Sequence, residues 1–265
     1  MVAVEKMNNL NGLLKGLYIP VAVFLSWAIG SHFALWSSYI IPPPAEVAAT
    51  FVQAVADGTL IRNLLISFYR VFAGFMTALL LAVPLAVLLG MNKHWSPYVH
   101  TSLEWARHIP PLATIPILIL WFGIGELPKL LIVVMATFFP IFFNSLHGVG
   151  SCDSKLVEVG KSFCMNRRQI FRYVVLPAAL PSVLVGMRLG LGYSWRALVG
   201  AELIAASSGI GYMILDAEQL SRPDLVIIGI LTIGVMGTLI DWMFFTLAKK
   251  VVPWREGEET DYGRG

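Results

Sequence analysis

Long apolar segments separated by short polar ones dominate this sequence. A helix needs about 20 predominantly apolar residues to cross the hydrocarbon core of a bilayer, and roughly six segments reach that length. They are Leu17–Trp36, Ser67–Gly90, His100–Phe122, Lys129–Val149, Ala178–Ala206 and Leu225–Ala248. The pattern predicts an all-α, polytopic membrane protein with about six transmembrane helices. We expect an N-terminal segment at 1–16, a transmembrane domain at 17–248 and a C-terminal tail at 249–265.

The third segment should bend, because Pro110, Pro111 and Pro116 lie inside it. Each proline lacks a backbone N–H and clashes with the preceding helical turn. The first part of this segment is also only mildly apolar. We predict that it crosses the membrane as a bent helix.

Small residues form a stripe along two of the predicted spans. Gly186, Gly190 and Ser194 mark the fifth span, and the second carries Gly74, Ala78, Ala82, Ala86 and Gly90 at four-residue spacing. Helices in lipid associate where small residues let their backbones approach closely. Both stripes are therefore predicted to be packing seams, within the subunit or in a dimer of it.

Composition and charge agree with an integral membrane protein. The 265 residues are 57% hydrophobic and 13% charged, with a mean hydropathy of +0.74. The net charge of +3 comes from basic residues spread over loops, so the sequence predicts no nucleic-acid partner.

The positions of lysine and arginine predict the orientation of the chain. Arg62, Lys129 and Arg222 fall in the proposed outer loops. The proposed inner side holds Lys6, Lys15, Lys93, Lys155, Lys161, Arg167, Arg168, Arg172, Lys249, Lys250 and Arg255. Cytoplasmic loops of membrane proteins carry an excess of such residues. We therefore expect both termini in the cytoplasm.

A charged loop at 151–177 interrupts the apolar pattern and is expected to lie in water on the inner side. Two short helices are predicted in it. Asp153 can cap the first helix, Asn166 can cap the second with Gln169 in the capping-box position, and Pro177 should end the second.

The first helix of this loop carries an apolar stripe of Leu156, Val159 and Phe163 at helical spacing. An apolar patch with a basic rim suits a protein partner. The alternative is an ordinary solvated loop of the kind that any polytopic protein needs.

Several motifs in this loop resemble those of a loop that is known from a protein family. Glu158-Val159-Gly160, then Arg167–Phe171 and Leu176-Pro177, look like the cytoplasmic coupling loop of the membrane subunits of ATP-binding-cassette importers. In that family the loop docks into a groove on the ATPase subunit. The resemblance assigns this contact to Glu158, Val159, Gly160, Cys164, Arg167, Arg168 and Pro177. The sequence departs from the family where Val159-Gly160 replaces two alanines and Cys164 replaces a glycine.

The wider chain resembles the nitrate, sulfonate, taurine and bicarbonate group of these importers. The similar segments include 109–126, Phe138–Ile141 and 201–212, and the resemblance covers Pro42–Trp254. It implies a homodimer in lipid that opens alternately to either side of a bacterial-type inner membrane. Two cytoplasmic ATPase subunits would drive it and an outer binding protein would deliver a small oxyanion. Related members carry uncharged vitamin precursors, which remain an alternative substrate class.

Ionisable residues at membrane depth are candidates for the translocation pathway. Arg188, Arg196 and Glu202 lie in or near the fifth span, and such groups usually face the bundle interior or a watery cavity. At 100° per residue, Arg188 and Arg196 lie roughly 80° apart around the helix, so both can line one side and attract an anion. Alternatively, the two arginines pair with carboxylates such as Glu202 and never meet substrate.

Polar residues also flank the inner end of the third span. Glu104, Arg107 and His108 are expected to reach the membrane surface or to pair with one another. A proton relay through them is the alternative.

The sequence predicts no catalysis by this chain. It contains no G-x-x-x-x-G-K-[ST] phosphate loop, so ATP must be bound and hydrolysed by a partner, and no cofactor of its own is expected. Cys152 and Cys164 lack neighbouring histidines, and neither H-E-x-x-H nor G-x-S-x-G occurs, so no metal site is expected either. The rival classes are a membrane-embedded enzyme and a secondary transporter, which would be expected to show more spans and an internal repeat.

Overall fold

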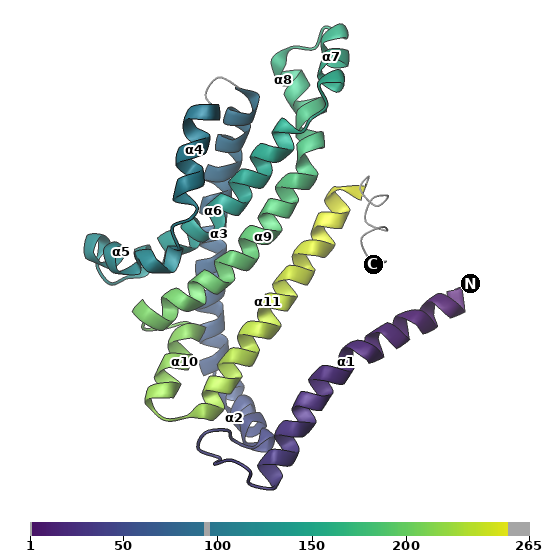
Figure 1. The fold of residues 1–265 in the computed structure, drawn as a ribbon. Coiled ribbons are helices and arrows are strands. Elements are labelled where there is room, and N and C mark those ends of the chain that lie inside the picture. The colour runs from purple at the N-terminus through teal and green to yellow at the C-terminus, as the bar shows by residue number, and fades with distance from the viewer. Residues whose placement is uncertain (1, 93–95, 254–265) are drawn as a thin grey trace. The chain divides into compact units, whose positions relative to one another are not determined.

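The computed structural model describes residues 2–92 and 96–253, and across these ranges the chain forms helices and connecting loops without a β-strand (Figure 1). The helices are α1 (Val2–His32), α2 (Pro44–Ala56), α3 (Thr59–Met91), α4 (Ser96–Ala106), η1 (Pro111–Thr114), α5 (Ile115–Phe122), α6 (Glu126–Gly150), α7 (Ser154–Ser162), α8 (Arg167–Ile170), η2 (Phe171–Val175), α9 (Leu176–Ala205), α10 (Ile210–Gln219) and α11 (Pro223–Val251). The expected all-α, polytopic fold is confirmed.

Four of the described helices are long and apolar enough to cross a membrane. They are Thr59–Met91, Glu126–Gly150, Arg167–Ala205 and Pro223–Val251, and they contain the second, fourth and sixth predicted spans and all of the fifth except Ala206. The first and third predicted spans correspond to shorter apolar helices at Tyr18–His32 and Pro111–Phe122.

The chain divides into two compact units, one of Met1–Ile61 with Met213–Leu231 and the other of Arg62–Tyr212 with Thr232–Gly265. In the first unit, helix α1 continues through the expected boundary at residue 16 and ends at His32, four residues before the predicted end of the span. After the helix, the Trp36 ring lies against Gly30, where a Cβ atom would overlap it.

In the second unit, α6 packs between the small-residue stripes of α3 and α9. On α3, Ala78, Ala82 and Ala86 are fully buried, and a Cβ atom on Gly74 would meet Val133 of α6. A Cβ atom on Gly186 of α9 would meet the Pro140 carbonyl oxygen of α6 at 2.9 Å. The predicted seams are thus confirmed as contacts within the subunit.

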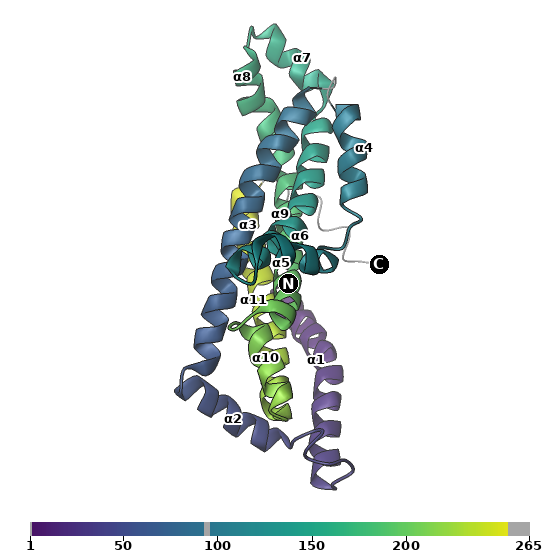
Figure 2. The same ribbon diagram turned by 90° about the vertical axis from the view of Figure 1, so that its left-hand side faces the viewer.

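The prediction of one bent third span is wrong, because the helix stops at the proline pair. Helix α4 ends at Ala106, and Pro110 has an extended backbone with ψ of 124°. Two consecutive residues without N–H groups cannot continue the helical ladder, so a 3-10 turn begins at Pro111 and α5 follows with Pro116 in its first turn. In Figures 1 and 2, α5 runs across the direction of α6 instead of along it.

The loop at 151–177 folds at the end of the α6 and α9 pair (Figure 1). Both predicted caps are confirmed: Asp153 Oδ1 accepts from the Lys155 N–H, and Asn166 and Gln169 form the reciprocal capping box. The prediction that Pro177 ends the second helix is wrong. A π-turn, in which the Leu176 N–H donates to the Phe171 carbonyl, leads into α9, and Pro177 sits in the first turn of that helix.

Parts of the predicted inner side lie outside the described residues. These are Lys93 in the loop between α3 and α4, and the portion of the predicted tail beyond residue 253 that includes Arg255.

Candidate functional site

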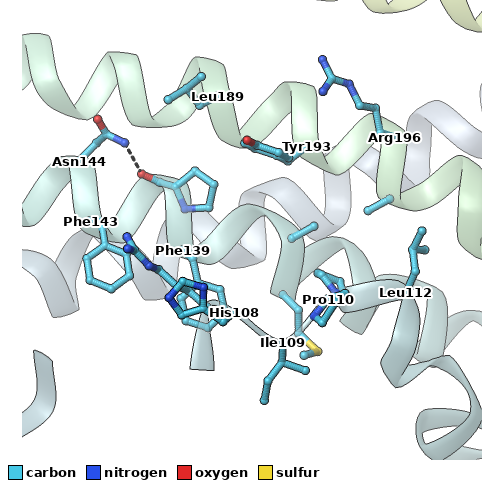
Figure 3. Close-up of a pocket in the computed structure, with 16 residues that line it drawn as sticks. His108, Ile109, Pro110, Leu112, Phe139, Phe143, Asn144, Leu189, Tyr193 and Arg196 are labelled. Atoms are coloured by element: carbon cyan, nitrogen blue, oxygen red, sulfur yellow. Dashed lines mark hydrogen bonds between the residues drawn. The ribbon is translucent and has the colours of Figure 1, made fainter. Parts of the chain in front are cut away.

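A cavity of about 600 Å³ lies in the second unit between the α4–η1 connection, α6 and α9, and we name it the α4–α9 cavity (Figure 3). It occupies the depth at which α4 gives way to η1. The break at the proline pair therefore provides one of its walls. Its lining residues are Arg107, His108, Ile109, Pro110, Pro111, Leu112, Met135, Ala136, Phe139, Pro140, Phe143, Asn144, Leu189, Tyr193, Arg196 and Ala197.

The charged side chains that line this cavity are cationic. Of the described residues that line it, Arg107 and Arg196 carry guanidinium groups and none carries a carboxylate. The Arg107 guanidinium lies 5.1 Å from the centre of the Phe143 ring, and its Nη2 is 3.8 Å from Glu104 Oε1 on the preceding helical turn. The pairing expected between Glu104 and Arg107 is thus present. A cationic wall attracts anions.

Arg196 lies on the α9 side of the cavity, opposite His108, and its guanidinium points away from His108 in Figure 3. It lies 6.0 Å from the centre of the Tyr193 ring. The same side chain also lines a second cavity of about 160 Å³ between α9 and α11. Arg196 is therefore accessible from two cavities. Its predicted role in the pathway stays a prediction.

Arg188 is held by a carboxylate that the sequence did not assign to it. Its Nε and Nη2 atoms donate to the two oxygens of Asp241 on α11, both at 2.7 Å, and its guanidinium lies 4.8 Å from the Phe245 ring centre. Arg188 borders the second cavity and is not part of the α4–α9 cavity wall. A signal was present in the sequence, since Asp241 is the single acidic residue in the sixth predicted span.

Glu202 lies in a buried ionic cluster at the opposite end of α6 from the 151–177 loop. Arg70 of α3 occupies the centre of this cluster and uses all five of its N–H donors. Nε and Nη2 donate to Glu126 at 2.6 Å, and Nη1 donates to Glu202 at 2.7 Å. The remaining two donors bind the carbonyl and the hydroxyl of Ser208.

Further hydrogen bonds enclose the Glu202 carboxylate. The Ser67 hydroxyl donates to it at 2.8 Å, and the Gly211 N–H donates at 3.0 Å. Gly209 has φ of +111°, and a Cβ atom there would overlap the carboxylate, so this turn requires glycine. Glu202 has no exposed surface. The role of Glu202 in the pathway stays a prediction, and the structure adds a packing role that ties α9 to α3.

Sequence reasoning missed Arg70 and Glu126. Arg70 is the single charged residue of the second predicted span, and that signal could have identified it as buried and paired. Lys129, which we assigned to an outer loop, donates to Glu126 at 2.7 Å and is itself buried. Two cations and two carboxylates thus balance within one cluster.

The predicted coupling loop exposes an apolar face. Leu156, Val159 and Phe163 of the α7 region are 51%, 52% and 75% exposed, which is costly in water unless a partner covers them. A groove of about 480 Å³ adjoins this face, and it is lined by Leu156, Val159, Gly160, Phe163, Met165, Tyr173, Val174, Pro177 and Ala178.

Of the other residues assigned to coupling, Gly160 and Pro177 line this groove. Glu158, Arg167 and Arg168 are exposed, whereas Gly160 is buried against Ile170. An alanine Cβ at Gly160 would meet Ile170 at 3.5 Å, an ordinary packing distance, so this departure from the family pattern leaves the fold of the loop intact. Cys164 has φ of +56°, which is the left-handed conformation that favours glycine. The family pattern has glycine at this position.

The two cysteines are free thiols. Burial, with a smaller contribution from Asp153, raises the pKa of Cys152 above its ordinary value, so this thiol is protonated at neutral pH. Within the described residues, no three histidine, cysteine or acidic side chains gather in a group that could hold a metal ion.

Comparisons with known proteins agree with this architecture. Residues 78–253 match the family described as the binding-protein-dependent transport system inner membrane component. A Bacillus subtilis (strain 168) protein provisionally named as an aliphatic sulfonates transport permease is 38% identical, over 94% of this chain and 90% of its own. The taurine transport system permease of Escherichia coli (strain K12) is 33% identical over 88% of this chain and 87% of its own. The nitrate import permease of Synechocystis sp. (strain PCC 6803) is 30% identical over 91% of this chain and 93% of its own.

Solved structures share the fold at low sequence identity. An inward-facing MetNI methionine ABC transporter chain has a TM-score of 0.62 and 17% identity, covering 74% of this chain and 95% of that chain. A chain of an amino acid ABC transporter crystallised with histidines has a TM-score of 0.60 and 14% identity, covering 77% of this chain and 97% of that chain.

The apolar helices of membrane-spanning length and the family match define a multi-pass membrane permease without catalytic machinery of its own. The chain belongs to the binding-protein-dependent transport system inner membrane component family, and it is the permease subunit of an ATP-binding-cassette importer. ATP hydrolysis in such an importer takes place in a separate subunit, and a binding protein delivers the substrate.

Proposed function

We propose that this permease moves a small oxyanion of the sulfonate, taurine, nitrate or bicarbonate type into the cell, through a pathway that includes the α4–α9 cavity. The observation that carries the proposal is the cationic lining of that cavity. Its lining residues include Arg107 and Arg196 and no aspartate or glutamate. Relatives named for sulfonates, taurine and nitrate are at least 30% identical to this chain, and each of these compounds carries an oxyanion group.

The assembly proposed is a homodimer in lipid with two ATPase subunits in the cytoplasm. The apolar face of Leu156, Val159 and Phe163 supports ATPase docking, because a water-exposed apolar patch with basic neighbours suits a protein groove. Of the residues assigned to docking, Gly160 and Pro177 line the adjoining groove, and Glu158, Cys164, Arg167 and Arg168 are exposed.

The orientation proposed places the 151–177 loop and both termini in the cytoplasm. The support is the excess of basic residues on that side, as in Arg167, Arg168 and Arg172 of the loop. The Arg70 cluster, at the other end of α6, would then lie toward the outer face.

Uptake by the reconstituted importer tests the proposal. Arg196→Gln should leave the dimer and its ATPases assembled but depress anion uptake, because the pathway loses a cation. Glu158→Lys should leave the permease in the membrane but release the ATPases, because it reverses a charge on the docking face. Unchanged uptake with Arg196→Gln removes Arg196 from the pathway. Uptake of an uncharged compound in place of every oxyanion would contradict the proposed substrate class.

A further inference from the structure

We propose that the α4–α9 cavity is a binding site of the permease itself for an aliphatic sulfonate, with Arg107 holding the sulfonate group and the apolar wall holding the tail. This inference rests on the proposed function and narrows it to one substrate class. It assigns substrate selection to the membrane subunit as well as to the binding protein.

Arg107, His108 and Tyr193 are lining residues with polar groups that the head of the ligand can use. The 3.8 Å separation between Arg107 Nη2 and Glu104 Oε1 is too long for a hydrogen bond, so that pair does not saturate the guanidinium. The guanidinium carbon of Arg107 lies 5.1 Å from the centre of the Phe143 ring, and this cation–π contact does not use its N–H groups. A planar guanidinium presents two parallel donors to an oxyanion, and a sulfonate offers three equivalent oxygens.

The tail of the ligand is matched by the rest of the wall. Apolar side chains make up most of the lining: Ile109, Pro110, Pro111, Leu112, Met135, Ala136, Phe139, Pro140, Leu189 and Ala197. Figure 3 shows Ile109, Pro110 and Leu112 on one side of the cavity and Leu189 on the other. Nitrate and bicarbonate have no apolar part and would leave this surface uncovered. An alkyl chain would cover it.

The size of the cavity fits the same ligand. Its volume of about 600 Å³ lies in the range of small-molecule sites, about 300–1,000 Å³. Each methylene group buried against apolar side chains raises the affinity roughly fourfold. A series of alkanesulfonates should therefore bind more tightly as the chain lengthens, up to the size of the cavity.

The test is equilibrium binding to the permease–ATPase complex in lipid nanodiscs, without the binding protein. Radiolabelled hexanesulfonate is the bound ligand, and unlabelled methane-, butane- and hexanesulfonate, nitrate and bicarbonate are the competitors. Empty nanodiscs correct for partition of the ligand into lipid. We expect saturable binding, an affinity that rises with chain length, and weak competition by nitrate and bicarbonate. Equal competition by nitrate and hexanesulfonate would overturn the assignment.

Variants test the contribution of Arg107 and the contribution of the apolar wall separately. Arg107→Gln should weaken every sulfonate about tenfold or more and leave the dependence on chain length intact, whereas Leu189→Asn should flatten that dependence. Arg62→Gln removes an exposed arginine of α3 outside the cavity and serves as the matched control. If Arg107→Gln does not assemble, Tyr193→Phe removes one donor with little change of shape and should weaken binding severalfold. Binding that is the same in these variants as in Arg62→Gln contradicts the proposal.

Transport by the complete importer distinguishes a failure of this binding site from a failure of the proposed function. If the wild-type importer with its binding protein takes up an anion while the nanodisc complex binds no sulfonate, this site is wrong and the proposed function stands. If the complete importer takes up no anion, the proposed function fails and this inference fails with it.

Discussion

Arg70 on α3 donates to Glu202 on α9 at 2.7 Å, and no more than 2% of either side chain is exposed. The two residues are 132 positions apart in the chain. Removing two charges from water is costly, and the cost is offset here because Arg70 satisfies all five donors and Glu202 also accepts from Ser67 and Gly211. The pair therefore fixes α3 against α9 at the end of the second unit opposite the 151–177 loop.

The first prediction concerns this buried pair. Arg70→Gln leaves the Glu202 carboxylate buried without its cation, which should cost about 3–5 kcal/mol of stability. Thermal unfolding of the purified permease in mild detergent, followed by tryptophan fluorescence, measures the loss. Arg62→Gln, two turns earlier on the same helix but exposed, is the control and should unfold like the wild type.

A double variant completes this test. Arg70→Met with Glu202→Leu removes both charges and should recover part of the stability that Arg70→Gln loses, because no charge on Glu202 remains to be desolvated. An Arg70→Gln protein as stable as the control would mean that the cluster does not hold the helices together.

The features that were predictable from sequence are local ones. Apolar runs of bilayer length predicted α3, α6, α9 and α11, because a helix in lipid must satisfy its own backbone. The caps at Asp153 and Asn166 were predictable because a capping residue and its partner lie within three positions. Pro177 misled us, since proline is excluded from a helix interior but tolerated in a first turn.

The contacts that were not predictable join distant parts of the chain. Arg70 meets Glu126 and Glu202 across 56 and 132 positions, and Arg188 meets Asp241 across 53. A sequence shows that such charges need partners at membrane depth but not which partners they find. The α4–α9 cavity was hidden for the same reason, because it exists only where the Pro110–Pro111 break meets α6 and α9.

The second prediction concerns the turn at Cys164. A residue other than glycine at φ of +56° costs about 1 kcal/mol, because its Cβ approaches the carbonyl oxygen. Cys164→Gly should therefore raise the stability of the purified permease by up to about 1 kcal/mol, less the extra chain entropy that glycine brings to the unfolded state. The midpoint of thermal unfolding measures this change, and ATPase binding should be retained.

Cys164→Val provides the opposite case. A β-branched residue is strained further in the left-handed conformation, so this variant should be less stable than the wild type. If valine and glycine at position 164 give equal stability, the turn adopts another conformation in solution.

The third prediction concerns the reactivity of Cys152. Because burial raises the pKa of this thiol, the thiolate fraction at pH 7.5 is smaller than for an ordinary cysteine. In a Cys164→Ser background, alkylation of Cys152 by N-ethylmaleimide should be slow at pH 7.5 and should rise about tenfold per pH unit up to its pKa. The control is the Cys152→Ser protein, in which N-ethylmaleimide alkylates the exposed Cys164. Alkylation of Cys152 that levels off below pH 8 would contradict the raised pKa.

The last prediction concerns the ion pair between Arg188 and Asp241, whose side chains are 44% and 50% exposed. Partial exposure limits what the pair contributes, and we expect a coupling free energy of about 1 kcal/mol from a double-mutant cycle. Arg188→Leu and Asp241→Leu should each destabilise the permease, because each removes one charge of the ion pair and keeps the other. The double variant should be more stable than the sum of the single losses predicts, since two apolar side chains can pack between α9 and α11. Thermal unfolding of the four proteins measures the cycle. Strictly additive losses would show that the two side chains act independently and that this pair does not join the two helices.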